Sequence, residues 1–353
     1  MRLLLDARKV EDYGIGVYIQ EIFGRLLQTP WEDIRVIHLS GKKRLPVTPE
    51  KEVLAHSPNY RAWEQLEIPW KTRHFHGYYY FSPHYVFPWL IRQSLIVTVH
   101  DLIHFKFPQF FGPPLKLKAA GFFLRQIRSR AVLIIAVSKQ TAVDLAEMFM
   151  IPIDKIKIIY NGVGEIFFQA PPSSSPLPFP YILYLGNWKP HKNINTLLAA
   201  FSLLAARYPE LRLVLLGVPP APGIQKEIAR FRLEAKCLLL GFIPQKAVIP
   251  YLDGALFFVF PSLYEGFGLP PLEAMARGRA VLSSPGGSLR EVLAEAALYF
   301  DPNSAEDLKT KMELLVENEE LRHAYEARGK ARSLNFTWEK SFAHHLHFLR
   351  QLD

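Results

Sequence analysis

The hydrophobic positions of this chain gather into short unbroken runs, and the segments between them repeat apolar residues at the spacing of a helix. Apolar runs without polar interruptions are typical of strands buried on both faces of a parallel sheet. Their alternation with amphipathic segments favours an α/β architecture in which helices cover the sheet. The predicted strands are 2–5, 34–39, 95–99, 131–137, 156–160, 181–185, 211–216, 238–240, 256–259 and 280–282, and the predicted helices include 18–27, 140–150, 196–208 and 289–295.

A segment rich in proline and serine divides the chain near its middle. Residues 169–180 contain five prolines and three serines, a composition that continues neither a helix nor a central strand. We therefore predict two doubly wound α/β domains, 1–168 and 181–335, joined by this linker. The first 170 residues carry 22 basic and 15 acidic side chains, whereas the remainder carries 20 and 18, which favours separate duties for the two domains.

Length and composition exclude several classes of protein. The 353 residues exceed what one hydrophobic core comfortably organises, and 49% hydrophobic with 21% charged residues excludes a disordered chain. The single cysteine, Cys237, excludes a disulfide scaffold and a cysteine-based zinc site, and it fits a reducing compartment. No apolar run approaches the roughly 18–20 residues that span a bilayer. Asp6 interrupts the apolar start, so it does not resemble a signal peptide, and we expect a cytoplasmic protein.

The densest motif of the chain is the segment 260–276, where an apolar strand leads through a glycine-containing loop into a helix. Gly266 and Gly268 allow backbone N–H groups to approach a ligand closely, and the start of a helix favours an anion such as phosphate. Glu265 and Glu273 can accept hydrogen bonds from the hydroxyls of a bound ligand. The structural alternative is a plain glycine turn followed by an early helical glutamate.

Five further segments accompany this motif in a fixed order along the chain: 13–19, 97–102, 136–139, 159–163 and 184–193. Together with 260–276, whose glutamates form an E-x7-E pattern, they resemble the retaining glycosyltransferases of the GT-B fold, especially glycosyltransferase family 4. The resemblance extends over nearly the whole chain. It implies two Rossmann-like domains facing a central cleft, with a C-terminal helix in 336–353 that packs back on the N-terminal domain.

The resemblance also implies roles for single residues in binding a nucleotide sugar. Glu265 matches the carboxylate beside the donor sugar, and Glu273 matches the one beside the ribose of the nucleotide. Lys192 matches the phosphate-binding lysine, and we expect Lys189 to replace the arginine that family members commonly carry beside it. The other residues that the resemblance assigns to donor binding are Gly14, Gly16, Gly266, Phe267, Gly268 and Leu269.

His100 and Asp101 follow a run of β-branched residues, so we expect them at the carboxyl edge of a sheet, where ligands of α/β proteins bind. A histidine there can hydrogen-bond a sugar hydroxyl, and an aspartate can orient that hydroxyl or an acceptor. With Glu265, they are the candidate catalytic residues. The alternative is an aspartate that caps a helix beside a structural histidine.

The chemistry of the leaving group suggests a mechanism without a metal. Departure of a nucleoside diphosphate develops negative charge, which cations or oriented N–H groups must stabilise. The sequence has no Asp-x-Asp pair to hold a divalent metal, so lysines and helix-terminal N–H groups are the natural substitute. The resemblance implies a retaining outcome. We favour a front-face route, in which the departing phosphate oxygen takes the acceptor proton, over a double displacement that needs an enzymic nucleophile.

We therefore expect transfer of a hexose to a glycan or glycolipid acceptor in polysaccharide or lipopolysaccharide biosynthesis. The glycine-loop and His-Asp segments are most similar to those of mannosyltransferases, so GDP-mannose is the first expected donor and a UDP-sugar such as UDP-glucose the second. The alternatives are another nucleotide-sugar enzyme on the same frame, such as an epimerase, and a non-catalytic carbohydrate-binding scaffold.

A basic and aromatic stretch lies between residues 105 and 139, with no acidic residue from 112 to 139. It suits contact with an anionic membrane surface, or an acidic or lipid-diphosphate acceptor. Nucleic acid is a further alternative, but no motif for binding it accompanies the charge. The structural alternative is that the phenylalanines are core and the cations solvated. The residues are Lys116, Lys118, Arg125, Arg128, Arg130 and Lys139 with Phe105, Phe107, Phe110, Phe111, Phe122 and Phe123.

Overall fold

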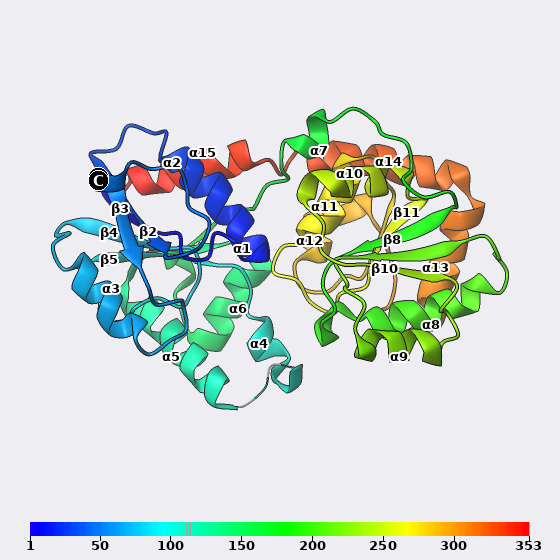
Figure 1. The fold of residues 1–353 in the computed structure, drawn as a ribbon, viewed down its shortest axis with the longest axis horizontal. Helices are drawn as coiled ribbons and strands as arrows, with labels where there is room; N and C mark the ends of the chain where they lie inside the picture. Colours follow the sequence, from blue (N-terminus) through cyan, green and yellow to red (C-terminus); the bar gives the residue numbers. More distant parts are fainter. Residues whose placement is uncertain (111, 113, 353) are drawn as a thin grey trace. The chain divides into compact units, whose positions relative to one another are not determined.

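The computed structural model describes residues 1–110, 112 and 114–352; Phe111 and the side chain of Lys116, which belong to the basic and aromatic stretch, lie outside the described residues. The chain forms two compact units (Figure 1). Unit 1 comprises residues 1–161 and the segment from Trp338 onward, and unit 2 comprises residues 162–337. The last helix, α15 (Trp338–Arg350), therefore belongs to the same unit as the N-terminal half of the chain.

Unit 1 is built on a seven-stranded sheet in which neighbouring strands are parallel. The strand order is β3-β2-β1-β4-β5-β6-β7, so the direction in which the chain adds strands reverses between β1 and β4. The strands are β1 (Arg2–Asp6), β2 (Asp33–Leu39), β3 (Glu52–Ala55), β4 (Tyr78–Ser82), β5 (Ser94–Val99), β6 (Ala131–Ala136) and β7 (Ile156–Ile158).

Helices cover both faces of this sheet (Figure 1). One face is packed by α3, α5 and α6, which contribute Ile68, Ile127 and Leu145 to a core that also contains Leu4 and Val97. The helices are α1 (Tyr13–Tyr18), continued by a π-helical turn (Ile19–Phe23) and α2 (Gly24–Leu26), then α3 (Glu64–Thr72), α4 (Ile103–Lys106), α5 (Pro114–Arg130) and α6 (Lys139–Phe149).

Unit 2 repeats this architecture with a six-stranded sheet of parallel strands. The order β10-β9-β8-β11-β12-β13 reverses between β8 and β11. The strands are β8 (Tyr181–Leu185), β9 (Arg212–Leu216), β10 (Cys237–Leu240), β11 (Phe257–Phe260), β12 (Val281–Ser283) and β13 (Leu298–Tyr299). The helices are α7 (Ile166–Gln169), α8 (Ile194–Ala205), α9 (Pro222–Arg230), α10 (Gln245–Gly254), α11 (Leu269–Ala276), α12 (Leu289–Leu293), α13 (Ala305–Glu317) and α14 (Glu319–Ser333).

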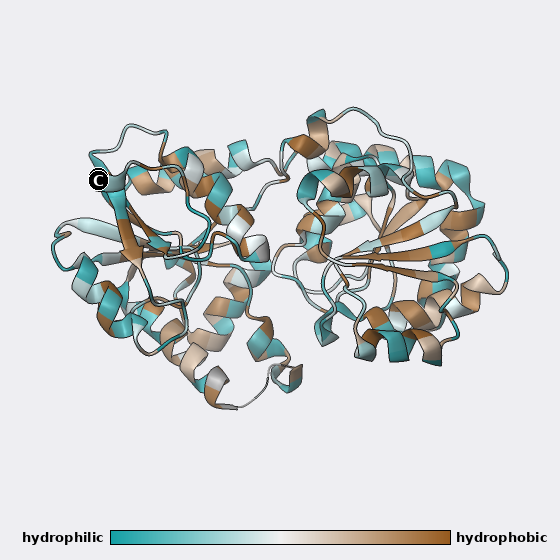
Figure 2. Cartoon of the chain, in the orientation of Figure 1, coloured by the Kyte–Doolittle hydropathy of each residue, from teal (hydrophilic) through white to brown (hydrophobic). Residues whose placement is uncertain are grey.

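Each predicted strand corresponds to a strand of the structure, and the sheets contain three more: β3, β4 and β13. The central strand β4 reads Tyr-Tyr-Tyr-Phe-Ser, an aromatic rather than aliphatic run, and it pairs with both β1 and β5. The edge strand β13 has only two residues. The doubly wound α/β prediction is confirmed for both sheets, and Figure 2 shows the strands of unit 2 as largely hydrophobic.

The proline- and serine-rich segment 169–180 lies in unit 2 rather than between the units. A nearly buried ion pair between Arg277 and Asp253, with N···O 2.7 Å, holds it there. The Arg277 guanidinium donates to the carbonyl of Ala170 (2.6 Å), and Asp253 accepts hydrogen bonds from the amide (2.9 Å) and hydroxyl (2.7 Å) of Ser173. The unit boundary therefore falls at residues 161–162.

In the described ranges, no helix is long and apolar enough to cross a bilayer.

A buried polar chain joins α15 to the core of unit 1. The His345 Nδ1–H donates to the carbonyl of Ser341 (2.8 Å), so its Nε2 accepts from the hydroxyl of Tyr18 (2.7 Å). The Tyr18 oxygen in turn lies 2.8 Å from Oγ1 of Thr98 on β5. Burial lowers the pKa of His345 to about 4, which keeps the imidazole neutral and the chain of donors and acceptors intact at neutral pH.

Replacing Tyr18 by Phe removes the hydroxyl that connects α15 to β5. The Thr98 hydroxyl and the His345 Nε2 atom then lose their hydrogen bonds to that hydroxyl. We expect Tyr18→Phe to lower the free energy of unfolding by about 1–3 kcal/mol, because unsatisfied buried polar groups carry that cost. Urea denaturation followed by circular dichroism measures it. Tyr79→Phe is the control, since the half-buried Tyr79 hydroxyl reaches only the carbonyl of Leu352 near the chain end. Equal effects of both variants would contradict the role of this chain.

Candidate functional site

The candidate residues of unit 2 lie where its strand order reverses. The loop after β8 carries Lys189 and Lys192, and the loop after β11 carries Glu265; β8 and β11 are neighbours in the sheet. The two loops are joined directly, because the amide of Leu263 donates to the carbonyl of His191 (2.8 Å). Ligands of open α/β sheets bind at such a reversal, since the loops of its two strands diverge and leave space between them.

Lys192 and Glu265 meet as an ion pair at this edge. The Nζ atom of Lys192 lies 2.6 Å from Oε1 of Glu265, and each side chain is 15% exposed. The same ammonium group lies 5.4 Å from the centre of the Phe260 ring, the last residue of β11. A cation and a carboxylate side by side can serve one ligand that carries both an anionic and a hydroxyl group. The structure thus brings together two of the predicted donor-binding residues.

The backbone around Glu265 is held by a loop that the sequence analysis did not single out. Glu265 forms a parallel bridge with Gly287, and its carbonyl accepts hydrogen bonds from the amide (3.0 Å) and hydroxyl (3.1 Å) of Ser288. Because β12 ends at Ser283, this loop is the next one along the same sheet edge. The sequence signal was the Gly286-Gly287 pair that follows a buried strand.

The rest of the loop is tightly packed up to the start of α11. Gly266 is buried, and Gly268 has φ +90°; a Cβ there would lie 2.6 Å from a methyl group of Leu289. Phe267 packs edge-on against Phe336, 5.7 Å between ring centres. Leu269 begins the helix, and Pro270 and Pro271 in its first turn have no backbone N–H to donate to an anion.

Glu273 lies just over one turn into α11, and its side chain is partly buried. Burial raises the pKa of Glu273 to about 7, although a hydrogen bond from Gln245 at the start of α10 acts in the opposite direction. A carboxyl group with this pKa changes its charge near neutral pH.

Lys189, the other predicted phosphate-binding lysine, lies three residues before Lys192 and is exposed.

In unit 1, the predicted glycines and the His-Asp pair lie at the corresponding edge, after β1 and β5. Gly16 is required by packing, because a Cβ there would lie 2.6 Å from the carbonyl oxygen of Val10. Gly14 is exposed in the first turn of α1, and a Cβ there would meet no atom within 4 Å.

His100 and Asp101 are both partly exposed at the end of β5. The Nε2 atom of His100 lies 2.9 Å from the carbonyl of Pro83 and donates to it, which leaves Nδ1 as an acceptor. Burial lowers the pKa of His100, so the ring is neutral. Oδ1 of Asp101 accepts from the amide of Ile103 (3.1 Å), the first residue of α4, although the N-cap position of that helix is Leu102. The second carboxylate oxygen is the one that can serve a ligand.

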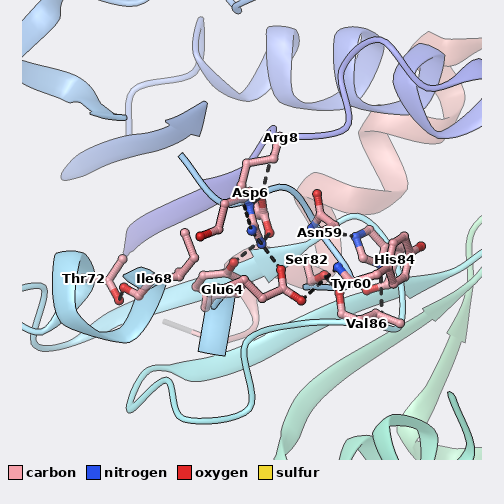
Figure 3. A network of polar contacts seen from close by, with 12 residues as sticks. Asp6, Arg8, Asn59, Tyr60, Glu64, Ile68, Thr72, Ser82, His84 and Val86 are labelled. Carbon is pink, nitrogen blue, oxygen red and sulfur yellow. Dashed lines mark hydrogen bonds and ion pairs between the residues drawn. The ribbon is translucent and has the colours of Figure 1, made fainter. Parts of the chain in front are cut away.

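A buried charge network under the edge of unit 1 escaped the sequence analysis (Figure 3). The Arg8 guanidinium pairs with Asp6 (2.7 Å) and Glu64 (2.9 Å), and all three side chains are at most 1% exposed. Burial would raise the pKa of Asp6, but the Arg8 charge and the hydrogen bonds from Arg8 and Tyr80 together outweigh it, and the value falls to about 2. The hydroxyl of Tyr80 also donates to Asp6 (2.7 Å). In the sequence, Asp6 is only the polar end of an apolar run.

The network positions Tyr60 beside a cavity of about 510 Å3 whose lining includes Lys9, Asp12, Asn59 and Tyr60. Glu64 accepts a hydrogen bond from the Tyr60 amide (3.1 Å), and Tyr60 has φ +69°, a strained value for a residue with a side chain. The residue is 59% exposed, and the Lys9 ammonium lies 4.8 Å from the centre of its ring. Figure 3 shows His84, which follows β4, next to Asn59 and Tyr60.

Comparison with known proteins identifies the family. The family "Glycosyl transferases group 1" matches residues 167–332, and "Glycosyltransferase Family 4" matches residues 28–164. O-antigen chain mannosyltransferase B of Escherichia coli is 30% identical over 296 residues, which cover 79% of this chain and 76% of that protein. The chain belongs to glycosyltransferase family 4.

Other relatives cover less of their own length. The serotype-specific mannosyltransferase WbdA of Escherichia coli is 31% identical over 268 residues, but these span 71% of this chain and only 32% of that protein.

Among solved structures, a sucrose-phosphate synthase from Thermosynechococcus elongatus is similar over 100% of this chain and 99% of its own chain, with a TM-score of 0.78 and 18% identity. Anabaena Alr3699/HepE in complex with UDP-glucose covers 99% and 100% at TM-score 0.79 and 16% identity. The glycosyltransferase therefore has the GT-B fold.

Family membership confirms the resemblance drawn from the six motifs, and glycosyltransferases of this group use nucleotide-sugar donors. The structure brings Lys192 and Glu265 into contact, whereas it uses Phe267 and Gly16 for packing.

Glu273 provides a prediction for this glycosyltransferase about stability and pH. Its pKa is about 7 in the folded state and near 4.5 in an unfolded chain, so the folded state binds more protons between these values and loses stability as the pH rises through them. Glu273→Gln, which is neutral at every pH, should therefore be more stable than the unmodified protein at pH 8, by at most about 3 kcal/mol. The gain should shrink towards zero near pH 5.

Thermal unfolding at several pH values measures this difference. Glu234→Gln is the matched control, because Glu234 is exposed. If the gain from Glu273→Gln were the same at pH 5 and pH 8, the charge of Glu273 would not be its cause.

Proposed function

We propose that this glycosyltransferase transfers mannose from GDP-mannose, with retention of configuration, to a lipid-linked glycan in the biosynthesis of an O-antigen-like polysaccharide. The names of the relatives support the sugar and the pathway, since the O-antigen chain mannosyltransferases B and RfbU are 30% and 29% identical to this chain. A UDP-sugar is the second candidate donor. The observation that carries the proposal is the contact between Lys192 and Glu265 at the strand-order reversal of unit 2.

The donor side of the reaction follows from that pair. The Lys192 ammonium would leave its partner for the diphosphate, whose negative charge grows as the bond to the sugar breaks. Glu265, released from the ion pair, would accept hydrogen bonds from sugar hydroxyls. Glu273 would accept from the ribose, and the exposed Lys189 would add a second cation near the phosphates.

The acceptor side belongs to unit 1. The acceptor hydroxyl forms the new bond to the anomeric carbon on the face that the diphosphate leaves, and its proton passes to the departing phosphate oxygen. The bond electrons stay with the diphosphate, where Lys192 would stabilise the charge in place of a metal. Because the departing phosphate oxygen takes the proton, this route needs no enzymic base. His100, with Nδ1 as a free acceptor site in its neutral ring, and Asp101 would orient the sugar hydroxyls.

A panel of nucleotides tests the donor. We expect GDP and GDP-mannose to raise the melting temperature selectively and equally with and without EDTA. At 100 times its dissociation constant, a ligand stabilises the folded state by about 2.7 kcal/mol. Stabilisation by UDP or ADP instead would overturn GDP-mannose, loss of the effect with EDTA would overturn metal independence, and no stabilisation by any nucleotide would favour a non-catalytic scaffold.

In the same panel, Lys192→Ala should weaken binding of the preferred nucleotide by about 10- to 100-fold, because a hydrogen bond to a charged group is lost. Lys226→Ala is the matched control, since Lys226 is exposed on α9 away from the loop of Lys192 in sequence. Lys189→Ala should give a smaller loss. Unchanged nucleotide affinity in Lys192→Ala would rule out the proposed phosphate contact.

The acceptor glycan is proposed to bind at the cavity beside Tyr60. Apolar sugar faces pack on exposed aromatic rings. Asn59 and the ion pair of Lys9 with Asp12 supply hydrogen-bonding groups to the lining of the cavity. We expect Tyr60→Ala to raise the KM for the acceptor about tenfold while leaving the KM for the donor unchanged. Initial rates with each substrate varied in turn measure both. The exposed neighbour Arg61 provides the control Arg61→Ala, and equal acceptor KM values in both variants would place the acceptor elsewhere.

A further inference from the structure

Helix α3 of unit 1 has an unusual polarity: its acidic residues Glu64 and Glu67 face the protein together with Ile68, whereas Leu66, Trp70 and the preceding Trp63 face outward. Glu64 and Glu67 are 1% and 8% exposed, whereas Trp63, Leu66 and Trp70 are 64%, 55% and 63% exposed. The three apolar residues are spaced by three and four positions, which places them on one side of the helix. A helix at the surface of a globular protein normally buries its large apolar side chains and exposes its acidic ones.

The buried acids fix this orientation. Glu64 accepts from Arg8 (2.9 Å) and from the amide of Tyr60, and Glu67 accepts from the amides of His56 (2.8 Å) and Ser57 (2.7 Å). Turning α3 to bury its tryptophans would break all of these hydrogen bonds and leave the Arg8 charge without Glu64. The outward position of the tryptophans is therefore built into the unit.

The outer side of α3 continues onto α5 through Trp89. The Trp89 amide donates to the side chain of Gln65 on α3 (2.7 Å), and the Trp89 ring lies 6.0 Å from the ring of Phe122 on α5. Figure 1 places α3 and α5 on the same face of the sheet. The continuous surface, called the apolar face below, consists of Trp63, Leu66, Trp70, Trp89, Leu90 and Phe122, each at least 40% exposed.

Cations accompany the apolar face. Arg73 extends the outer side of α3, with its guanidinium 4.7 Å from the centre of the Trp70 ring. Lys118 and Arg125 are exposed on α5, at positions neighbouring Phe122 along the helix, and Arg92 is exposed two residues after Leu90. The sequence from 112 to 139 carries no acidic residue. Tryptophan beside arginine and lysine is the composition of surfaces that rest in the headgroup region of a bilayer.

We propose that the apolar face docks on the surface of an anionic lipid bilayer. The inference rests on the proposed function, because a lipid-linked acceptor is presented at a membrane surface. The cations favour anionic headgroups, and the exposed tryptophans enter the boundary between headgroups and acyl chains. A protein partner would have to supply acidic groups to match the same cations, and it is an outcome that the test below can detect. Tyr60 precedes Trp63 by three residues, so the docked face would lie next to the acceptor cavity.

Co-sedimentation of the full chain with vesicles tests this proposal. We expect binding to vesicles of phosphatidylcholine with phosphatidylglycerol, weaker binding at high salt, and weaker binding to phosphatidylcholine alone. Trp63→Ala/Trp70→Ala should lower partitioning onto the anionic vesicles about tenfold, since two exposed apolar anchors are lost. Arg73→Glu/Lys118→Glu should lower it on anionic vesicles only.

The matched control is Phe242→Ala, because Phe242 is 71% exposed but lies in unit 2. Equal partitioning of the tryptophan double variant and the unmodified chain would overturn the proposal, as would absence of vesicle binding by the unmodified chain. Stable self-association that the same double variant abolishes, without vesicle binding, would identify a protein partner instead.

Nucleotide-induced stabilisation of each variant separates this proposal from the proposed function. Vesicle binding that depends on Trp63 and Trp70 in a chain that binds no nucleotide would contradict the function and leave the docking surface standing. A circular dichroism spectrum and a urea unfolding curve like those of the unmodified chain would show that the loss on vesicles is not a loss of folding of unit 1, which contains both tryptophans.

Discussion

Both sheets reverse their strand order once, and the closest contact between candidate binding residues in this protein depends on such a reversal. In unit 2 the reversal lies between β8 and β11, so residues 73 positions apart in sequence, Lys192 and Glu265, meet at 2.6 Å. In unit 1 it lies between β1 and β4, and the residues that follow these strands include Lys9 and His84. Parallel strands place all their carboxyl ends at one edge, and only a reversal leaves space there.

A buried cation organises the corresponding edge of unit 1. Taking Arg8 out of water is costly unless carboxylates compensate for it, and Asp6 and Glu64 do so from β1 and α3. Glu64, which pairs with Arg8, also accepts a hydrogen bond from the amide of Tyr60, whose backbone is strained. Because Glu64 is buried, the neighbouring tryptophans Trp63 and Trp70 lie on the exposed side. The cavity and the apolar face are therefore two consequences of one ion-pair network.

Much of this arrangement could be predicted from residue types and their spacing. Aliphatic runs marked ten strands, and the Glu-Gly-Phe-Gly segment marked the loop that contacts Lys192. The misses have physical causes. β4 is aromatic and polar rather than aliphatic, so no aliphatic run marks it in the sequence. The 169–180 segment has the composition of a linker, yet Arg277 and Asp253, far along the chain, bind it to unit 2.

By itself the sequence determined the α/β class, the family and the residue types available for donor binding, because these depend on local periodicity and on short motifs. Only the tertiary structure decided which side chains meet, which face inward and which charges are buried. Trp63 and Glu64 are adjacent in the chain, and helical propensity does not say which of them is buried. That outcome depends on Arg8, 56 residues before Glu64, because a buried guanidinium without a carboxylate costs more than an exposed tryptophan.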